Sequence, residues 1–143
     1  MPEIDIQLAS GLAAFEAKEF SRAIQLLSPL ADQGNAEAQH RLAIIYQNGL
    51  GFVKNDLYAY KWMRAAAEQG HPIAQHGLGF MCLHGECVNK NEAEAVKWFR
   101  LAAEQGLVGS QMILANMYET GQGVEKDPEE AQKWKKRAEG EQI

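Results

Sequence analysis

The sequence predicts an all-α protein built as an α-solenoid of about four helix–turn–helix repeats. Three observations support this: tryptophans that recur every 36 residues, apolar residues at helical intervals, and matched signals for helix starts and ends. Trp62, Trp98 and Trp134 define the spacing. No segment shows the sustained two-residue alternation of a half-buried strand, so no β-sheet is expected.

The same 36-residue period relates many other positions. It connects Ala59, Ala95 and Ala131; Gly49, Gly85 and Gly121; and Leu42, Leu78 and Leu114. The frame extends back to Ala23 and Gly34 in the N-terminal quarter. We therefore divide a single domain, 1–143, into repeats 1–35, 36–71, 72–107 and 108–143, of which the first has a shorter turn. Neighbouring repeats must stack, because one helix pair cannot bury its apolar face alone.

Local signals mark the ends of the expected helices. The second helix of the last repeat begins with Asp127 as N-cap, Pro128 at the first helical position and Glu130 three residues after the cap. Asn55 and Asn91 occupy the same cap position in the two preceding repeats. Glycines that close the alanine-rich helices are expected in the left-handed conformation, at Gly34, Gly70 and Gly106. The closing helix is lysine-rich, so we expect it to cap the stack with a polar outer face.

Composition excludes several classes of function. The chain of 143 residues has 14 basic and 19 acidic residues, a formal charge of −5, which opposes binding to a nucleic-acid backbone. No run approaches the ~18 apolar residues that span a bilayer, so membrane insertion is not expected. The two cysteines and the absence of a leader favour a cytoplasmic protein, although a chain that had lost a signal peptide would look the same.

The turn motif resembles that of a known repeat family. In the last repeat it consists of Tyr118, Gly121, Gly123, Val124, Lys126 and Asp127, followed by Ala131 and Trp134. This pattern resembles the Sel1-like repeat, a relative of the tetratricopeptide repeat with a longer turn; the first repeat is more similar to the tetratricopeptide repeat itself. The resemblance implies a right-handed superhelix whose first helices line a concave surface for other proteins. It implies no catalytic residue and no cofactor.

Candidate chemical sites are weak. The segments 49–51 and 121–123 have the form Gly-x-Gly, but no strand precedes them and no Gly-Lys-Ser/Thr ending follows, which disfavours phosphate binding. Cys82, His84 and Cys87 suggest zinc, yet a tetrahedral site needs four ligands and only His76 is an obvious addition. Burial of Cys82 in a helix is the better interpretation. We therefore expect neither an enzyme nor a metal or cofactor site.

The expected binding surface is a ribbon of apolar side chains edged by imidazoles and amides on the first helices. The alternative is that these side chains pack against one another across a narrow superhelix. The residues are Leu8, Leu12, Phe15, His40, Ile44, Gln47, Asn48, His76, Phe80, Leu83, His84, Met112, Asn116 and Glu119.

Such a surface predicts a non-catalytic scaffold or adaptor that binds a protein or peptide. A self-associating structural protein is the alternative, as a homodimer through the groove or through end-to-end stacking. If His40 and His76 line the site, binding should change between about pH 5 and 7.

Overall fold

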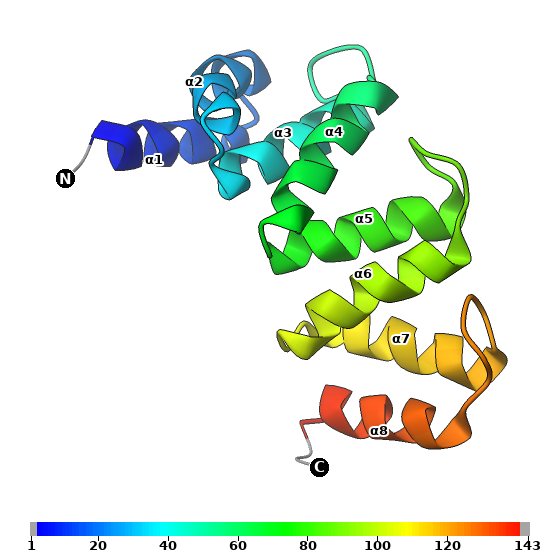
Figure 1. The fold of residues 1–143 in the computed structure, drawn as a ribbon. Helices are drawn as coiled ribbons and strands as arrows, with labels where there is room; N and C mark the ends of the chain where they lie inside the picture. Colours follow the sequence, from blue (N-terminus) through cyan, green and yellow to red (C-terminus); the bar gives the residue numbers. More distant parts are fainter. Residues whose placement is uncertain (1–2, 141–143) are drawn as a thin grey trace. The chain divides into compact units, whose positions relative to one another are not determined.

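The computed structural model describes residues 3–140, except for the side chain of Ile4, and this range contains eight α-helices and no strand (Figure 1). The prediction of an all-α helical solenoid is confirmed. No helix in the described range is long and apolar enough to cross a lipid bilayer. The helices are α1 (Glu3–Glu16), α2 (Phe20–Asp32), α3 (Ala36–Asn48), α4 (Asp56–Glu68), α5 (Pro72–His84), α6 (Glu92–Glu104), α7 (Val108–Thr120) and α8 (Pro128–Ala138).

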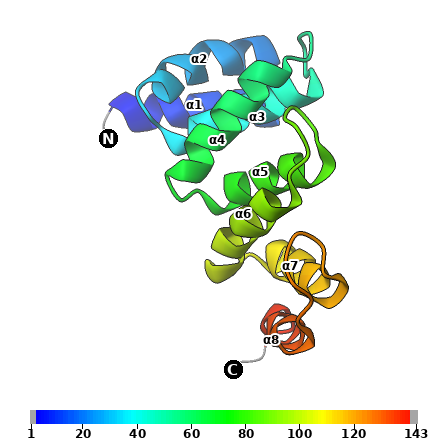
Figure 2. The ribbon, with the colours of Figure 1, turned by 45° about the vertical axis from the view of Figure 1, so that its right-hand side comes forward.

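The chain forms two compact units that divide between His71 and Pro72. In the first unit α1 packs on α2, α2 on α3 and α3 on α4, and α1 also contacts α3. In the second unit α5 packs on α6, α6 on α7 and α7 on α8 (Figures 1 and 2). Each unit therefore consists of two helix pairs, and the second helix of one pair packs against the first helix of the next.

The predicted N-caps are confirmed. The side chains of Asn55 and Asn91 accept hydrogen bonds from the backbone three residues later, at 3.0 Å in both cases. Asp127 accepts from the backbone N–H groups of Glu129 and Glu130, and Pro128 opens α8. These side chains satisfy backbone donors that the first turn of a helix leaves without partners.

The connection inside the first repeat is shorter than the others, as predicted. Residues 17–19 join α1 to α2, whereas 49–55 join α3 to α4. The longer turn has a left-handed backbone at two matching positions, and at the second of them φ is 70° at Gly51, 65° at Cys87 and 72° at Gly123. Cys87 thus adopts a conformation that costs a non-glycine residue about 1–2 kcal/mol. The turn keeps its shape in the third repeat at this cost.

The core of each unit is built from aliphatic and aromatic side chains of successive helices. In the first unit it includes Leu27, Leu30, Leu42 and Ile45, and in the second Leu78, Met81, Phe99, Leu114 and Met117. Trp98 and Trp134 are buried, and the half-buried Trp62 packs against the core of the first unit. Cys82 is also buried, as predicted.

A set of buried glutamines connects helices at the turns between helix pairs. Gln39 Nε2 donates to the carbonyl of Ala31, and Gln111 Nε2 donates to the carbonyl of Ala103, both at 3.0 Å. Gln69 Nε2 in turn donates to Gln39 Oε1 at 2.8 Å. The equivalent bond in the next repeat runs from Gln105 to Gln75 at 2.9 Å. Since buried amides are costly without partners, these bonds specify how the helices meet.

Candidate functional site

The first helices of the second unit, α5 and α7, carry the more exposed part of the predicted surface. On α5, Ile73, Phe80 and His84 are spaced by seven and four residues, which places them along one side of the helix. On α7, Met112 and Asn116 are spaced by four residues and lie on one side in the same way. We call the surface formed by Ile73, His76, Phe80, His84, Val108, Met112 and Asn116 the α5/α7 face.

Large apolar side chains of the α5/α7 face are exposed. The exposed fractions are 52% for Ile73, 39% for Phe80, 48% for Val108 and 60% for Met112. The rings of Phe80 and His84 lie 4.3 Å apart between centroids, so the imidazole partly shields the phenyl ring. Exposed apolar side chains that gather on one surface are typical of an interaction site.

His76 joins the two helices of this face. Its Nδ1 forms a hydrogen bond of 2.7 Å with Ser110 Oγ on α7, and its ring meets Phe99 edge-on with centroids 5.3 Å apart. A Cβ at Gly109 would lie 3.6 Å from the His76 ring, so α7 approaches the imidazole closely. Burial lowers the pKa of His76. The neutral imidazole is therefore favoured, and it orders the face by linking α5 to α7.

Charged side chains adjoin the α5/α7 face. A small hollow beside Met112 is lined by Lys135, Ala138 and Glu139 of the α8 region. Lys135 Nζ lies 2.5 Å from Glu119 Oε2 and lowers the pKa of Glu119 through its hydrogen bond and positive charge. The apolar surface around Met112 therefore has a charged border, as protein interfaces commonly do.

The predicted residues of the first unit are less accessible. Leu8, Leu12 and Phe15 on α1 are half-buried, as are Ile44 and Gln47 on α3. Arg41 closes the gap between these helices. Its guanidinium lies 4.9 Å from the centroid of the Phe15 ring and forms an ion pair with Glu16 at 3.0 Å. Asn48 is exposed and donates to the carbonyl of Ile44.

His40 lies in a polar cluster inside the first unit. It is only 6% exposed, and its ring lies 4.8 Å from that of His71 between centroids. Glu37 Oε2 accepts a hydrogen bond of 2.8 Å from His71 Nε2. Burial lowers the pKa of His40 to about 4, and the charge of a protonated His71 adds to this effect. The expected pH window of 5 to 7 is therefore wrong for His40.

The remaining predicted residues lie at the C-terminal ends of α5 and α7. Leu83 is half-buried, whereas His84, Asn116 and Glu119 are exposed.

The sequence analysis did not identify three residues that contribute to these surroundings. They are His71, which lies beside His40, and Val108 and Ser110 on α7. For Ser110 a signal existed, because the matching positions in earlier repeats are Ala38 and Ala74, so its hydroxyl departs from the repeat.

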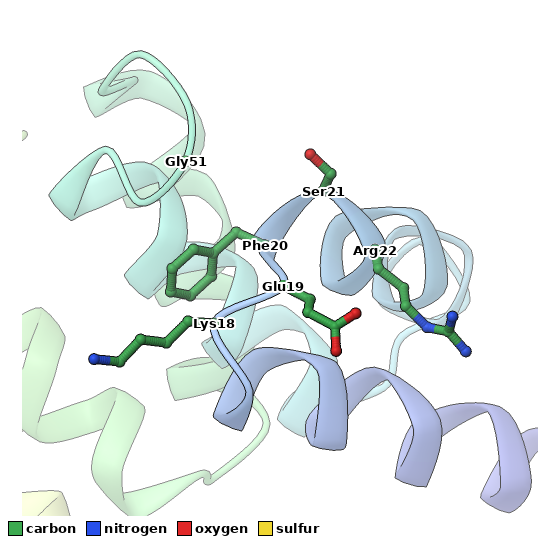
Figure 3. A pocket seen from close by; sticks show the side chains of 6 residues that line it. All are labelled: Lys18, Glu19, Phe20, Ser21, Arg22 and Gly51. Carbon is green, nitrogen blue, oxygen red and sulfur yellow. The ribbon is translucent and has the colours of Figure 1, made fainter.

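A second hollow lies where the turn between α1 and α2 meets the loop after α3 (Figure 3). Lys18, Glu19, Phe20, Ser21, Arg22 and Gly51 line it. A Cβ at Gly51 would lie 3.1 Å from Phe20 Cβ. The loop therefore packs closely on Phe20, and this packing explains the shape of the hollow. Its mixed charges select no particular ligand, and we assign it no function.

Comparison with solved structures supports the fold. A Sel1 repeat protein from Oxalobacter formigenes superimposes with a TM-score of 0.89 and 36% identity, over 93% of this chain and 55% of that one. A protective antigen of uropathogenic Escherichia coli strains that displays an SLR fold gives a TM-score of 0.91 and 36% identity, over 96% and 30%. The chain thus spans about half and about a third of these two proteins. Helicobacter pylori cysteine-rich protein B shares the fold, with a TM-score of 0.66 and 19% identity over 84% and 86% of the two chains.

The Sel1 repeat model matches residues 16–35, 36–71, 72–107 and 108–138. A search of curated proteins found no match. Sel1 repeats are in general scaffolds for protein interaction without catalytic activity of their own. Because the matched segments run without a gap from residue 16 to residue 138, this chain belongs to the Sel1 repeat family.

Proposed function

We propose that the protein is a non-catalytic adaptor that binds a segment of another protein on the α5/α7 face. The observation that supports this proposal is the exposure of Phe80 and Met112 on neighbouring first helices. Side chains of this size are usually buried unless a partner covers them, and aromatic residues and methionine are enriched at interfaces. Their position away from the core means that binding need not disturb the fold.

The chemistry of the face favours a partner with apolar anchors. Phe80 and Met112 offer apolar area, while His84 and Asn116 offer polar groups at its edge. A peptide in extended or helical form presents apolar side chains at regular intervals, which suits such a surface.

A paired substitution tests this function. A partner is isolated by cross-linking in native extract and purified, and its Kd is measured by titration calorimetry. Phe80→Ala with Met112→Ala should weaken binding at least about tenfold, because both anchors of the apolar contact are removed. The control is Leu101→Ala on α6, whose side chain is 38% exposed and thus matches Phe80 without belonging to the face.

The control should bind within about twofold of the unmodified chain. Circular dichroism spectra must show that all variants keep their helices. If the paired variant binds the purified partner as tightly as the unmodified chain does, the α5/α7 face is not the binding surface.

A further inference from the structure

Three side chains with metal-binding atoms meet in the first unit, where α3 begins and α4 ends. Glu37 and His40 are three residues apart on α3 and therefore lie on the same side of the helix. His71 follows directly after the residues that close α4. One potential ligand atom from each of the three lies within 4.8 Å of the others. In the described part of the chain this is the group of histidine and acidic side chains that comes together most closely for a metal ion.

The backbone that carries these side chains is fixed from both sides. Asn35 caps α3 by accepting from the N–H of Ala38 at 2.9 Å. At the end of α4, Gly70 has a φ of 92°, and the N–H of His71 donates to the carbonyl of Ala66 at 3.2 Å. The left-handed glycine and this backbone bond form a standard helix end. His71 is thus directed toward α3 by the way α4 terminates.

The carboxylate of Glu37 is ionised and oriented. Its Oε1 accepts from Arg41 Nε at 3.1 Å and its Oε2 accepts from His71 Nε2 at 2.8 Å. Burial alone would raise the pKa of Glu37, but the hydrogen bonds and charges of His71 and Arg41 outweigh it and lower the pKa. Arg41 also pairs with Glu16 at 3.0 Å. The carboxylates of Glu16 and Glu37 thus both pair with one guanidinium, so two negative charges face one positive charge, which favours an added cation.

His40 supplies a buried nitrogen that lacks a partner. It is 6% exposed, and its Nδ1 has no hydrogen-bond partner among the described residues. A buried polar atom without a partner is unfavourable, and it calls for an explanation in a folded protein. A neutral imidazole offers one nitrogen lone pair, so a metal ion could satisfy this buried side chain.

We propose that Glu37, His40 and His71 bind a divalent transition-metal ion, with Zn²⁺ the best match, through two imidazole nitrogens and one carboxylate oxygen. This combination of ligands is one that zinc accepts, and three protein ligands leave a fourth position for water. Ligand atoms around a tetrahedral zinc lie about 3.3 Å apart, as follows from bonds of about 2.0–2.2 Å.

Binding at His71 requires a proton to move. The Nε2 proton exchanges with water, so that Nε2 presents its lone pair to the metal while Nδ1 carries the one proton that the ring keeps. Glu37 Oε2, which no longer accepts a hydrogen bond from His71, then coordinates the metal. Arg41 continues to hold the other oxygen, Oε1, so the carboxylate keeps its orientation.

The cluster is not a feature of the repeat. The residues 36 positions later are Ile73, His76 and Leu107, so the second unit lacks the carboxylate and the second imidazole. His76 forms a hydrogen bond with Ser110 instead, whereas the residue at the same separation from His40 is Ala74, which has no hydroxyl group. Glu37 and His71 thus depart from the repeat, whereas His40 has its counterpart in His76.

Metal titration of the full chain tests the site. The chain is first freed of bound metal by a chelator, and any purification tag is removed. Calorimetry with Zn²⁺ should show one equivalent bound, and Co²⁺ should give the intense visible absorption of a tetrahedral complex. Glu37→Gln and His71→Asn should each weaken Zn²⁺ binding at least about tenfold. The first repeat has Asn35 at the position of His71, so the fold accommodates asparagine there.

Two matched variants exclude other metal ligands. His76→Asn alters the histidine that corresponds to His40, and Cys87→Ser removes the less buried thiol. Both should bind Zn²⁺ within about twofold of the unmodified chain. Circular dichroism confirms that each variant is helical. The proposal is overturned if the unmodified chain binds no Zn²⁺ in a saturable way, if Glu37→Gln and His71→Asn bind it as well as the unmodified chain, or if Cys87→Ser abolishes binding.

Discussion

His40 and His76 occupy the same position in successive repeats, yet their imidazoles have different neighbours. His76 has the Ser110 hydroxyl at 2.7 Å, whereas His40 faces Glu37 and His71. The 36-residue period predicts that both rings lie on corresponding helices. It does not predict their partners, because His76 meets a residue 34 positions later, whereas His40 meets residues 3 positions before and 31 positions after it.

The pH dependence of stability is expected to report on His76. Burial lowers the pKa of His76 in the folded state below the ordinary value for histidine, so the unfolded chain binds the proton more tightly. The free energy of unfolding is therefore full above about pH 6.5 and falls as the pH drops below that value. His76→Gln should lose less stability than the unmodified chain between pH 7 and pH 5, as measured by urea denaturation.

His84→Gln is the control for this measurement, because it replaces an exposed histidine on the same helix. It should follow the pH profile of the unmodified chain. Parallel profiles for His76→Gln and the unmodified chain would show that His76 does not contribute.

At the scale of the helices, sequence and structure agree where local chemistry decides. Asn55, Asn91 and Asp127 were predicted as N-caps, and each accepts backbone hydrogen bonds at the start of its helix. Caps can be recognised because their partners lie two or three residues away. Exposure of Phe80 and burial of His40 depend on how helices pack, and single-chain periodicity cannot distinguish them.

The cap of α6 gives a prediction at this scale. Asn91→Ala removes the acceptor for the N–H of Glu94 and should lower the free energy of unfolding by about 1 kcal/mol. Asn89→Ala, two residues earlier in the same loop, is the control and should change stability by less than about 0.5 kcal/mol. Equal losses for the two variants in urea denaturation would mean that the cap adds nothing.

At the scale of the whole molecule, several large apolar side chains are exposed. Phe80 and Met112 lie on the α5/α7 face, and Val53 and Leu57 are exposed near the start of α4. The formal charge of −5 opposes close approach of a second copy. Exposed apolar area favours association, but the shared negative charge opposes a second copy of the chain. Together these two effects favour a partner of different composition over self-association.

We therefore expect a single chain in solution. Sedimentation equilibrium should give the mass of one chain over about a hundredfold range of concentration. A mass that doubles with concentration would favour a homodimer instead. If Phe80→Ala with Met112→Ala then restored the mass of one chain, the α5/α7 face would be the dimer interface.

The glutamine bonds at the turns have a consequence for how such a protein can change in length. Each inner repeat contains one bonded pair of glutamines, and Gln39 and Gln111 each donate one further bond to a carbonyl of the helix before them. A tandem duplication of residues 72–107 would give the new Gln75 the carbonyl of Ala103 as its acceptor and pass the same acceptor on to Gln111. Genes for this architecture can thus grow by steps of 36 codons, and each new glutamine Nε2 still has a carbonyl to donate to. The greater lengths of the two Sel1-type structures are what such growth would produce.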